Sequence, residues 1–235
     1  MGERVLGQGS DRGTNGKKTL IEICRDIYDM DEESINFQRY LNQMSLIKLR
    51  QSVISNIMSK RTTTGYLYSD IEICVLQIRK IIELIAMGSI VSNIEEYSKI
   101  HDKYQKEWNA KHIFRDIERI NPRFYPEPID IDKSGVHDRF VPISTGYLTK
   151  EEAIELYDKC NAFLHENNPF KTSHEVSYYE ERIPIWNLKI IKLLNRHLVH
   201  IYDDYMYFVV MQSEKDGNPS GNIFEAIVDA NVKNA

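Results

Sequence analysis

The longest apolar stretch of the chain, Ser69 to Ile90, most limits what this sequence can fold into. Its apolar side chains recur every three or four residues, which is the period of one face of an α-helix. A second apolar row, formed by Ile73, Leu76 and Leu84, widens that face. A helix that is apolar over most of its circumference is predicted to lie at the centre of a bundle. Charged residues interrupt the stretch too often for a membrane span.

The ends and the polar side of this predicted helix carry their own signals. Ser69 and Glu72 have the spacing of a capping box, and Gly88 suits a left-handed helix end. Arg79 and Glu83 are four residues apart, so their side chains meet on one face. They form either a surface ion pair or a partly buried pair that holds a polar group of another helix.

Composition describes an ordinary soluble globular protein of 235 residues, with 42% hydrophobic and 28% charged residues. The net charge of -5 argues against nucleic-acid binding through bulk charge, but it allows a local basic groove. Cys24, Cys74 and Cys160 are far apart and suggest no disulfide framework, which favours a reducing cytoplasm. The polar, glycine-rich segment 1–18 is predicted to be a mobile tail, without the apolar core of a signal peptide.

The hydrophobic periods predict a mainly α fold, a helical bundle around the central buried helix with a small C-terminal antiparallel β-meander. The bundle is expected over residues 19–197 and the meander over 198–230, packed on the bundle. The predicted helices are 19–28, 31–61, 69–90, 92–108 with a continuation or a second helix over 110–120, 149–165 and 177–197. Three of them begin at capping-box pairs, Ser69/Glu72, Ser92/Glu95 and Thr149/Glu152. The predicted strands are 197–202, 205–212 and 222–228, with Asp203-Asp204 as a hairpin turn.

Residues 122–147 are predicted to be a long irregular loop, because prolines and glycines replace the helical period. Loops of that length within a compact domain are usually functional or ordered against a partner. The aromatic side chains in this loop indicate that it packs against the bundle.

The first candidate site is the helix end CNAFLHENNPF, which contains Asn161, His165, Asn167 and Asn168. Asn161 and His165 share one helical face, and the helix dipole favours a protonated His165 in the last turn. His165 is either a structural residue that caps carbonyl groups or a residue at a groove that meets RNA, a nucleotide or a partner chain.

The second candidate is Asn195, Arg196, His197 and His200 in LLNRHLVHIYDD. Two histidines at this spacing could bind a metal, and an arginine with a histidine could act on a phosphodiester. If the segment is a strand, His197 and His200 face opposite sides, which weakens both ideas. The alternative is a helix-to-strand junction with exposed polar residues.

Motifs for other chemistry are missing from the sequence. It contains no CxxC, HExxH or GxSxG pattern, so neither a metal site nor serine-hydrolase chemistry is predicted. The glycines Gly7, Gly9 and Gly13 lack the preceding strand and the GK[ST] ending of a phosphate loop. We therefore predict no cofactor.

Two stretches resemble HEPN-type helical domains. QIRKIIELIA, with Arg79 and Glu83, is similar to the HEPN core helix and its Arg-x-x-x-Glu pair, and KCNAFLHENNPF resembles the end of the last HEPN helix. NRHLVHIY looks like the signature of HEPN toxin nucleases. Arg196 and His200, however, are closer together than the catalytic Arg and His of that signature, and Asn195 occupies the place of the family arginine.

The resemblance implies a helical bundle that dimerises, with a groove for RNA or a partner, in a bacterial toxin–antitoxin or anti-phage system. The expected function is a non-catalytic HEPN-like interaction or nucleic-acid-recognition subunit, with Arg79, Glu83, Asn161, His165 and Asn168 as binding residues. Its tyrosines and aromatic loop fit a protein-contacting surface.

The rival expectation is a HEPN-type, metal-independent ribonuclease. In that case His165 or His200 is the general acid or base, and Arg79 or Arg196 stabilises the phosphorane charge.

Overall fold

The structure is a computed structural model that describes residues 32–100, 108–135, 139–165, 176–201 and 205–225. The chain divides into two units, Met1–Ile35 and Asn36–Ala235, and the architecture below is that of the second. The predicted tail 1–18, the predicted helix 19–28, Asp203-Asp204 and Asn168 lie outside the described residues.

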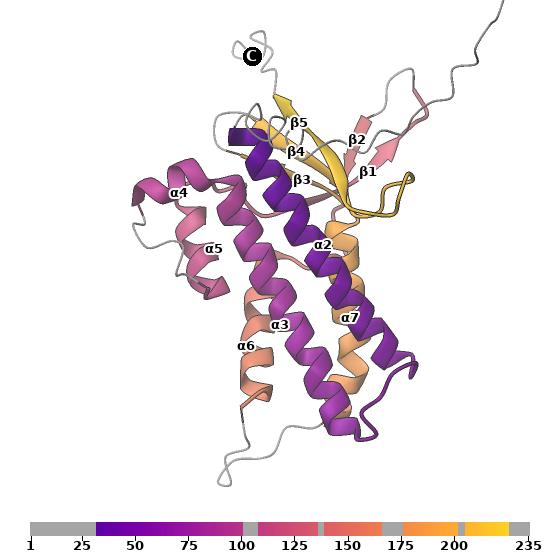
Figure 1. Cartoon of the computed structure of the whole chain (residues 1–235). Helices are drawn as coiled ribbons and strands as arrows, with labels where there is room; N and C mark the ends of the chain where they lie inside the picture. Colours follow the sequence, from indigo (N-terminus) through magenta and orange to yellow (C-terminus); the bar gives the residue numbers. More distant parts are fainter. Residues whose placement is uncertain (1–31, 101–107, 136–138, 166–175, 202–204, 226–235) are drawn as a thin grey trace, which may run out of the picture. The chain divides into compact units, whose positions relative to one another are not determined.

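The described helices agree closely with the hydrophobic periods of the sequence, and the mainly α fold is confirmed (Figure 1). The helices are α2 (Glu32–Met58), α3 (Leu67–Ser92), α4 (Ile94–Ile100), α5 (Ala110–Glu118), α6 (Lys150–Phe163) and α7 (Val176–Leu194). α3 is the central one, because helices α5, α6 and α7 all pack against it. Its main apolar row, from Ile71 to Ile90, is buried in one continuous core, whereas the second row is only half-buried at Ile73 and Leu84 and exposed at Leu76.

The ends of α3 differ from the predicted ones. Ser69 lies inside the helix, which begins after Tyr66 without a side-chain cap. Asp70 instead accepts hydrogen bonds from the Thr63 hydroxyl at 2.6 Å and the Thr64 amide at 2.7 Å, which fixes the preceding turn. Gly88 does not end the helix. It gives Tyr40 of α2 room to approach, because a Cβ atom there would lie 3.0 Å from the Tyr40 ring.

The two later capping boxes have different outcomes. The Ser92 hydroxyl donates to the Ser89 carbonyl within α3, and Asn93 forms the junction to α4. The Thr149 box is present in full: its hydroxyl accepts from the Glu152 amide, and the Glu152 carboxylate accepts from the Thr149 amide.

Replacing Thr149 by alanine is expected to lower the free energy of unfolding by about 1 kcal/mol, because the Glu152 amide in the first turn of α6 loses the hydroxyl that accepts its hydrogen bond. Urea denaturation measures this change. Thr145→Ala, which alters an exposed threonine of the preceding segment, is the matched control and should leave the midpoint unchanged. Equal effects of the two substitutions would contradict the capping role.

The sheet has five antiparallel strands in the order β2-β1-β3-β4-β5. The predicted meander is present as β3 (Arg196–His200), β4 (Tyr205–Val210) and β5 (Ser220–Glu225). The prediction that residues 122–147 are irregular was wrong in part, because they contain β1 (Glu127–Asp132) and β2 (Arg139–Pro142). The alternation in EPIDID is short and flanked by prolines, and β1 becomes a strand by pairing with β3 and β2.

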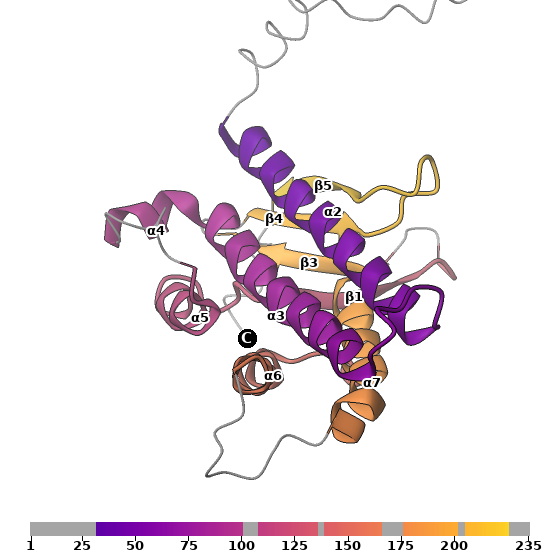
Figure 2. The same ribbon diagram turned by 60° about the horizontal axis from the view of Figure 1, so that its bottom comes forward.

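Helix α2 covers one face of the sheet, as the two views show (Figures 1 and 2). Phe37 and Tyr40 of α2 contact the ring of Tyr207 on β4. The Tyr40 hydroxyl lies 2.9 Å from Nε2 of His197, whose Nδ1 lies 2.8 Å from the Leu194 carbonyl oxygen. A carbonyl only accepts, so Nδ1 carries the proton and Nε2 accepts from Tyr40. His197 is thus a structural residue that ties α2, α7 and β3 together.

Candidate functional site

The Arg79–Glu83 pair of α3 lies against helix α6. Arg79 Nε is 3.2 Å and Lys80 Nζ 2.7 Å from the Glu83 carboxylate, whose side chain is 11% exposed. The Tyr157 hydroxyl of α6 donates to Glu83 at 3.4 Å, and the Arg79 guanidinium lies over the Tyr157 ring. The geometry is that of the partly buried pair, which holds a polar group of another helix.

The predicted site at the end of α6 is only partly assembled around this pair. Burial raises the pKa of the Cys160 thiol to about 12, and the nearby Arg79 charge opposes that shift. The contacts with Tyr157 place the Arg79–Glu83 pair against the helical turn before Asn161. Asn161 is half-buried and His165 is exposed, and within the described residues no hydrogen bond joins either of them to Arg79 or Glu83.

The second predicted site contains a cluster that sequence reasoning missed. The Arg123 guanidinium pairs with both oxygens of Glu127, at 3.1 and 3.0 Å. His200 Nε2 lies 3.0 Å from Glu127 Oε2 and 2.6 Å from Arg123 Nη2. Nε2 donates to Glu127 when it carries a proton and accepts from Arg123 when it does not, so the proton position is linked to both neighbours.

Electrostatics favour the ionised carboxylate in this cluster. Hydrogen bonds from His200 and Arg123 lower the pKa of Glu127 to about 2, against some desolvation. Glu127 is therefore negative at neutral pH. A histidine, an arginine and a carboxylate within hydrogen-bonding distance can bind an oxyanion or exchange a proton with it.

Two buried asparagines, Asn121 and Asn93, hold the backbone of His200 in place. Asn121, after α5, donates to the His200 carbonyl at 2.8 Å and to the Asn93 side-chain oxygen at 2.9 Å. Asn93 in turn donates to the Ser89 carbonyl near the end of α3. The His200 cluster is thus connected to the central helix by an unbroken series of hydrogen bonds.

An open hollow of about 540 Å³ adjoins the cluster, and Arg123 and Glu127 form part of its wall. Its other walls are formed by prolines and tyrosines of the segment that joins α5 to α6, including Pro126, Tyr125 and Tyr147. The Tyr125 hydroxyl donates to the Leu148 carbonyl at 3.1 Å, which fastens this segment to the start of α6. Of the aromatic residues in the predicted loop, Phe124 is buried and Tyr125 and Tyr147 are half-buried, whereas Phe140 is exposed.

The remaining candidates are not brought together. Arg196 pairs with Asp130 at 3.0 Å instead of contacting His200. His197 and His200 point to opposite faces of the sheet, as their spacing on a strand requires. Among the described residues, no group of three or more His, Cys, Asp or Glu could hold a metal ion.

The signals for the missed residues were weak. Arg123 and Glu127 are four apart in a proline-rich segment where no helical period indicates a shared face. Asn93 and Asn121 resemble ordinary helix-end residues.

Comparison of the chain with models of protein families, with curated proteins and with solved structures found no match. Across the part of the chain that is described, every helix is too short or too polar to cross a membrane.

Proposed function

We propose that this protein is a non-catalytic, HEPN-like subunit that recognises a nucleic acid or a partner protein, in a bacterial anti-phage or toxin–antitoxin system. The partner is a second copy of the chain or another subunit. The Arg79–Glu83 pair is central to this proposal, together with the neighbouring end of α6.

One observation carries the proposal: the Arg79–Glu83 pair is turned toward α6 and contacts Tyr157. The resemblance to HEPN domains predicts that the pair faces the Asn161–His165 end of α6. The contact with Tyr157 supports the approach of the two helices, one turn before that end. The non-catalytic form is favoured because Arg196 is paired with Asp130, and His165 has neither an arginine nor a carboxylate bound to it among the described residues.

A specific observation also favours the second candidate, a metal-independent ribonuclease. His200 has an arginine and a carboxylate within hydrogen-bonding distance, on the edge of an open hollow. In that enzyme His200 would exchange the proton of the attacking or leaving oxygen. Arg123, in place of Arg196, would stabilise the charge on the phosphorane.

Incubating the purified protein with mixed RNA in the presence of a chelator separates the two functions. For a non-catalytic subunit we expect no cleavage above background, and co-purification with a partner or self-association measured by light scattering. The Arg79→Ala, Glu83→Ala double variant should weaken that association. A monomer that binds neither RNA nor partner would contradict the proposal.

Cleavage by the wild type would favour the ribonuclease, provided that it depends on the cluster. His200→Ala and Glu127→Gln should then lower the rate by about 100-fold or more, the usual share of a general acid or base. His165→Ala tests the other predicted histidine. His112→Ala removes an exposed histidine of α5 and is the matched control.

A further inference from the structure

The sheet has a second face that no described helix covers. Along β3 and β4, the side chains of His197, Val199, Tyr207 and Val209 are all turned into the core and fully buried. Because side chains alternate along a strand, the residues between them point to the opposite face. We call this opposite side the outer face, formed on these strands and β5 by Arg196, Leu198, His200, Met206, Phe208 and Phe224.

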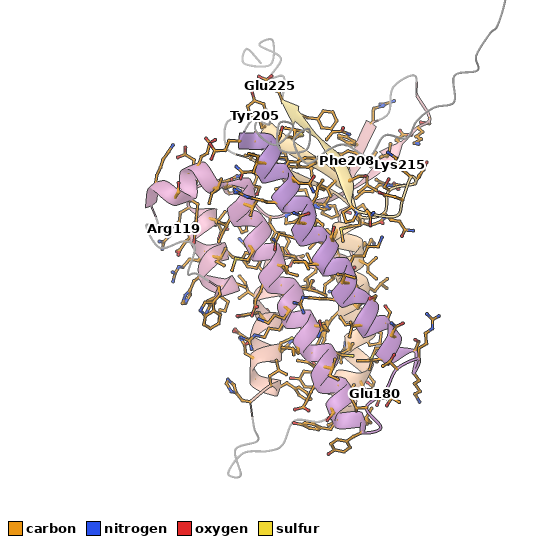
Figure 3. All side chains as sticks on the ribbon, in the orientation of Figure 1. Arg119, Glu180, Tyr205, Phe208, Lys215 and Glu225 are labelled. Atoms are coloured by element: carbon orange, nitrogen blue, oxygen red, sulfur yellow. The ribbon has the colours of Figure 1, made fainter. Side chains whose placement is uncertain are left out.

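Three phenylalanines gather on the outer face. The Phe208 ring on β4 stacks on Phe140 of β2, with a centroid distance of 5.0 Å and an angle of 29°. Phe224 of β5 meets the edge of the Phe140 ring at 6.2 Å. Figure 3 places Phe208 between the Tyr205–Glu225 end of the β4–β5 hairpin and its turn at Lys215.

The contact between Phe140 and Phe208 shows how this face is curved. β1 and β3 lie between β2 and β4, which puts the two strands about 14 Å apart in a flat sheet. Their rings touch only because the β1–β2 hairpin bends over the outer face. Phe140 and Phe224 are nevertheless 40% and 41% exposed, so the rings are not a closed core.

Basic groups border the three rings. In the strand register Phe208 is opposite Leu198, and the outer-face neighbours of Leu198 on β3 are Arg196 and His200. The Arg196 side chain is 41% exposed and pairs with Asp130. Arg123 lies beside His200, on the same side as the rings. The carboxylates of Asp130 and Glu127 are paired with Arg196 and Arg123.

We propose that the outer face binds single-stranded nucleic acid, with unpaired bases stacked on Phe140, Phe208 and Phe224 and phosphates held by Arg196 and the Arg123–His200 side. Aromatic rings on an antiparallel sheet with arginines at the border are the usual elements of sequence-tolerant single-strand recognition. This inference rests on the nucleic-acid form of the proposed function and adds the surface that carries it.

The chemistry of the surface favours a single strand over the alternatives. Bases inside a duplex are stacked on each other and offer no free face to a phenylalanine ring, so a duplex should not compete. The Arg123 and Arg196 side chains remain 61% and 41% exposed beside these rings, so a phosphate can reach them in competition with Glu127 and Asp130. Exposed Asn222 of β5 adds a hydrogen-bonding group for base edges.

Fluorescence anisotropy with a labelled, mixed-sequence single-stranded RNA tests the proposal on the full chain in low salt. Phe140→Leu and Phe224→Leu keep an apolar side chain but remove the ring. Each should weaken binding about tenfold, and the double variant about 100-fold, if each ring stacks on one base. Tyr66→Leu, which removes an exposed ring before α3, is the matched control and should bind like the wild type.

Salt titration supplies an independent readout. Arg196→Gln should reduce the slope of log K against log salt by about 0.7, the value for one phosphate on a single strand. The Phe→Leu variants should leave that slope unchanged. Arg61→Gln removes the same single positive charge at an exposed position shortly after α2. This variant should change neither the affinity nor the slope.

The possible outcomes separate this inference from the proposed function. RNA binding that both Leu variants and Arg196→Gln leave unaffected would overturn the outer face as the site, while nucleic-acid recognition would stand. No RNA binding by the wild type would overturn this inference and the nucleic-acid form of the proposed function, whereas the partner-protein form would stand. Phe140→Tyr and Phe224→Tyr retain a ring and should bind RNA with wild-type affinity. A tyrosine variant that binds as weakly as the leucine variant would show that the loss of affinity comes from misfolding and not from the missing ring.

Discussion

Between about pH 7 and pH 4 the protein is expected to lose about 3 kcal/mol of unfolding free energy through one buried group, His197. Burial lowers the pKa of His197 from 6.5 to about 4, although its hydrogen bond to Leu194 opposes the shift. The folded state therefore binds the proton less well than the unfolded chain. The contribution of neutral His197 to the free energy of unfolding is complete above pH 6.5 and is lost as the pH falls toward 4.

The measurement is a series of urea denaturation curves from neutral to acidic pH, with His197→Gln as the comparison. Glutamine does not titrate, and its oxygen can still accept from the Tyr40 hydroxyl. The wild-type curve should fall more steeply than that of the variant, by up to about 1.4 kcal/mol per pH unit. His112→Gln, at an exposed position, should follow the wild type. Parallel curves for wild type and His197→Gln would refute the role of His197.

Among the described glycines, Gly221 is the one where replacement by alanine is expected to be most disruptive, with a loss of about 3 kcal/mol or more in unfolding free energy. A Cβ atom at Gly221 would collide with the backbone carbonyl of Phe208 on the neighbouring strand. The same Cβ atom would lie 3.1 Å from the Cα atom of Val209. A backbone carbonyl of a central strand cannot move aside as a side chain can. β5 must therefore shift away from β4.

Gly217→Ala is the matched control for this substitution. Gly217, in the turn before β5, has a φ of +72° and open space where a Cβ atom would stand. Alanine there meets only the left-handed conformational penalty of about 1–2 kcal/mol. The thermal unfolding midpoint of Gly221→Ala should lie well below that of Gly217→Ala. Equal midpoints would show that the close approach to Phe208 has no energetic consequence.

The helices were predictable because each depends on a period within one stretch of sequence. The apolar positions of α3 repeat over 26 residues, and the Thr149–Glu152 box gave the start of α6 within one residue. The strands of the C-terminal meander were predictable for the same reason, since their alternation is local. β1 and β2 were not, because each is short and depends on pairing with a strand that is distant in sequence or across a turn.

The roles of individual residues depended on partners that no local pattern reveals. Gly88 looked like a helix end, but it accommodates Tyr40 from α2. His197 looked like half of a metal or phosphodiester pair, but its contact with Tyr40 spans 157 positions. His200 was among the candidate residues, but its partners Arg123 and Glu127 come from a segment that was predicted to be an irregular loop.

The sequence by itself determined the secondary structure of the bundle, the burial of the 69–90 stretch and the pairing of Arg79 with Glu83. These follow from spacing along one chain segment, where geometry is set by the helix or strand alone. Only the tertiary structure decided that this pair faces Tyr157, that Arg123 and Glu127 surround His200, and that three phenylalanines meet on the outer face. Those contacts join segments far apart in sequence, and the packing that brings them together is a property of the whole fold.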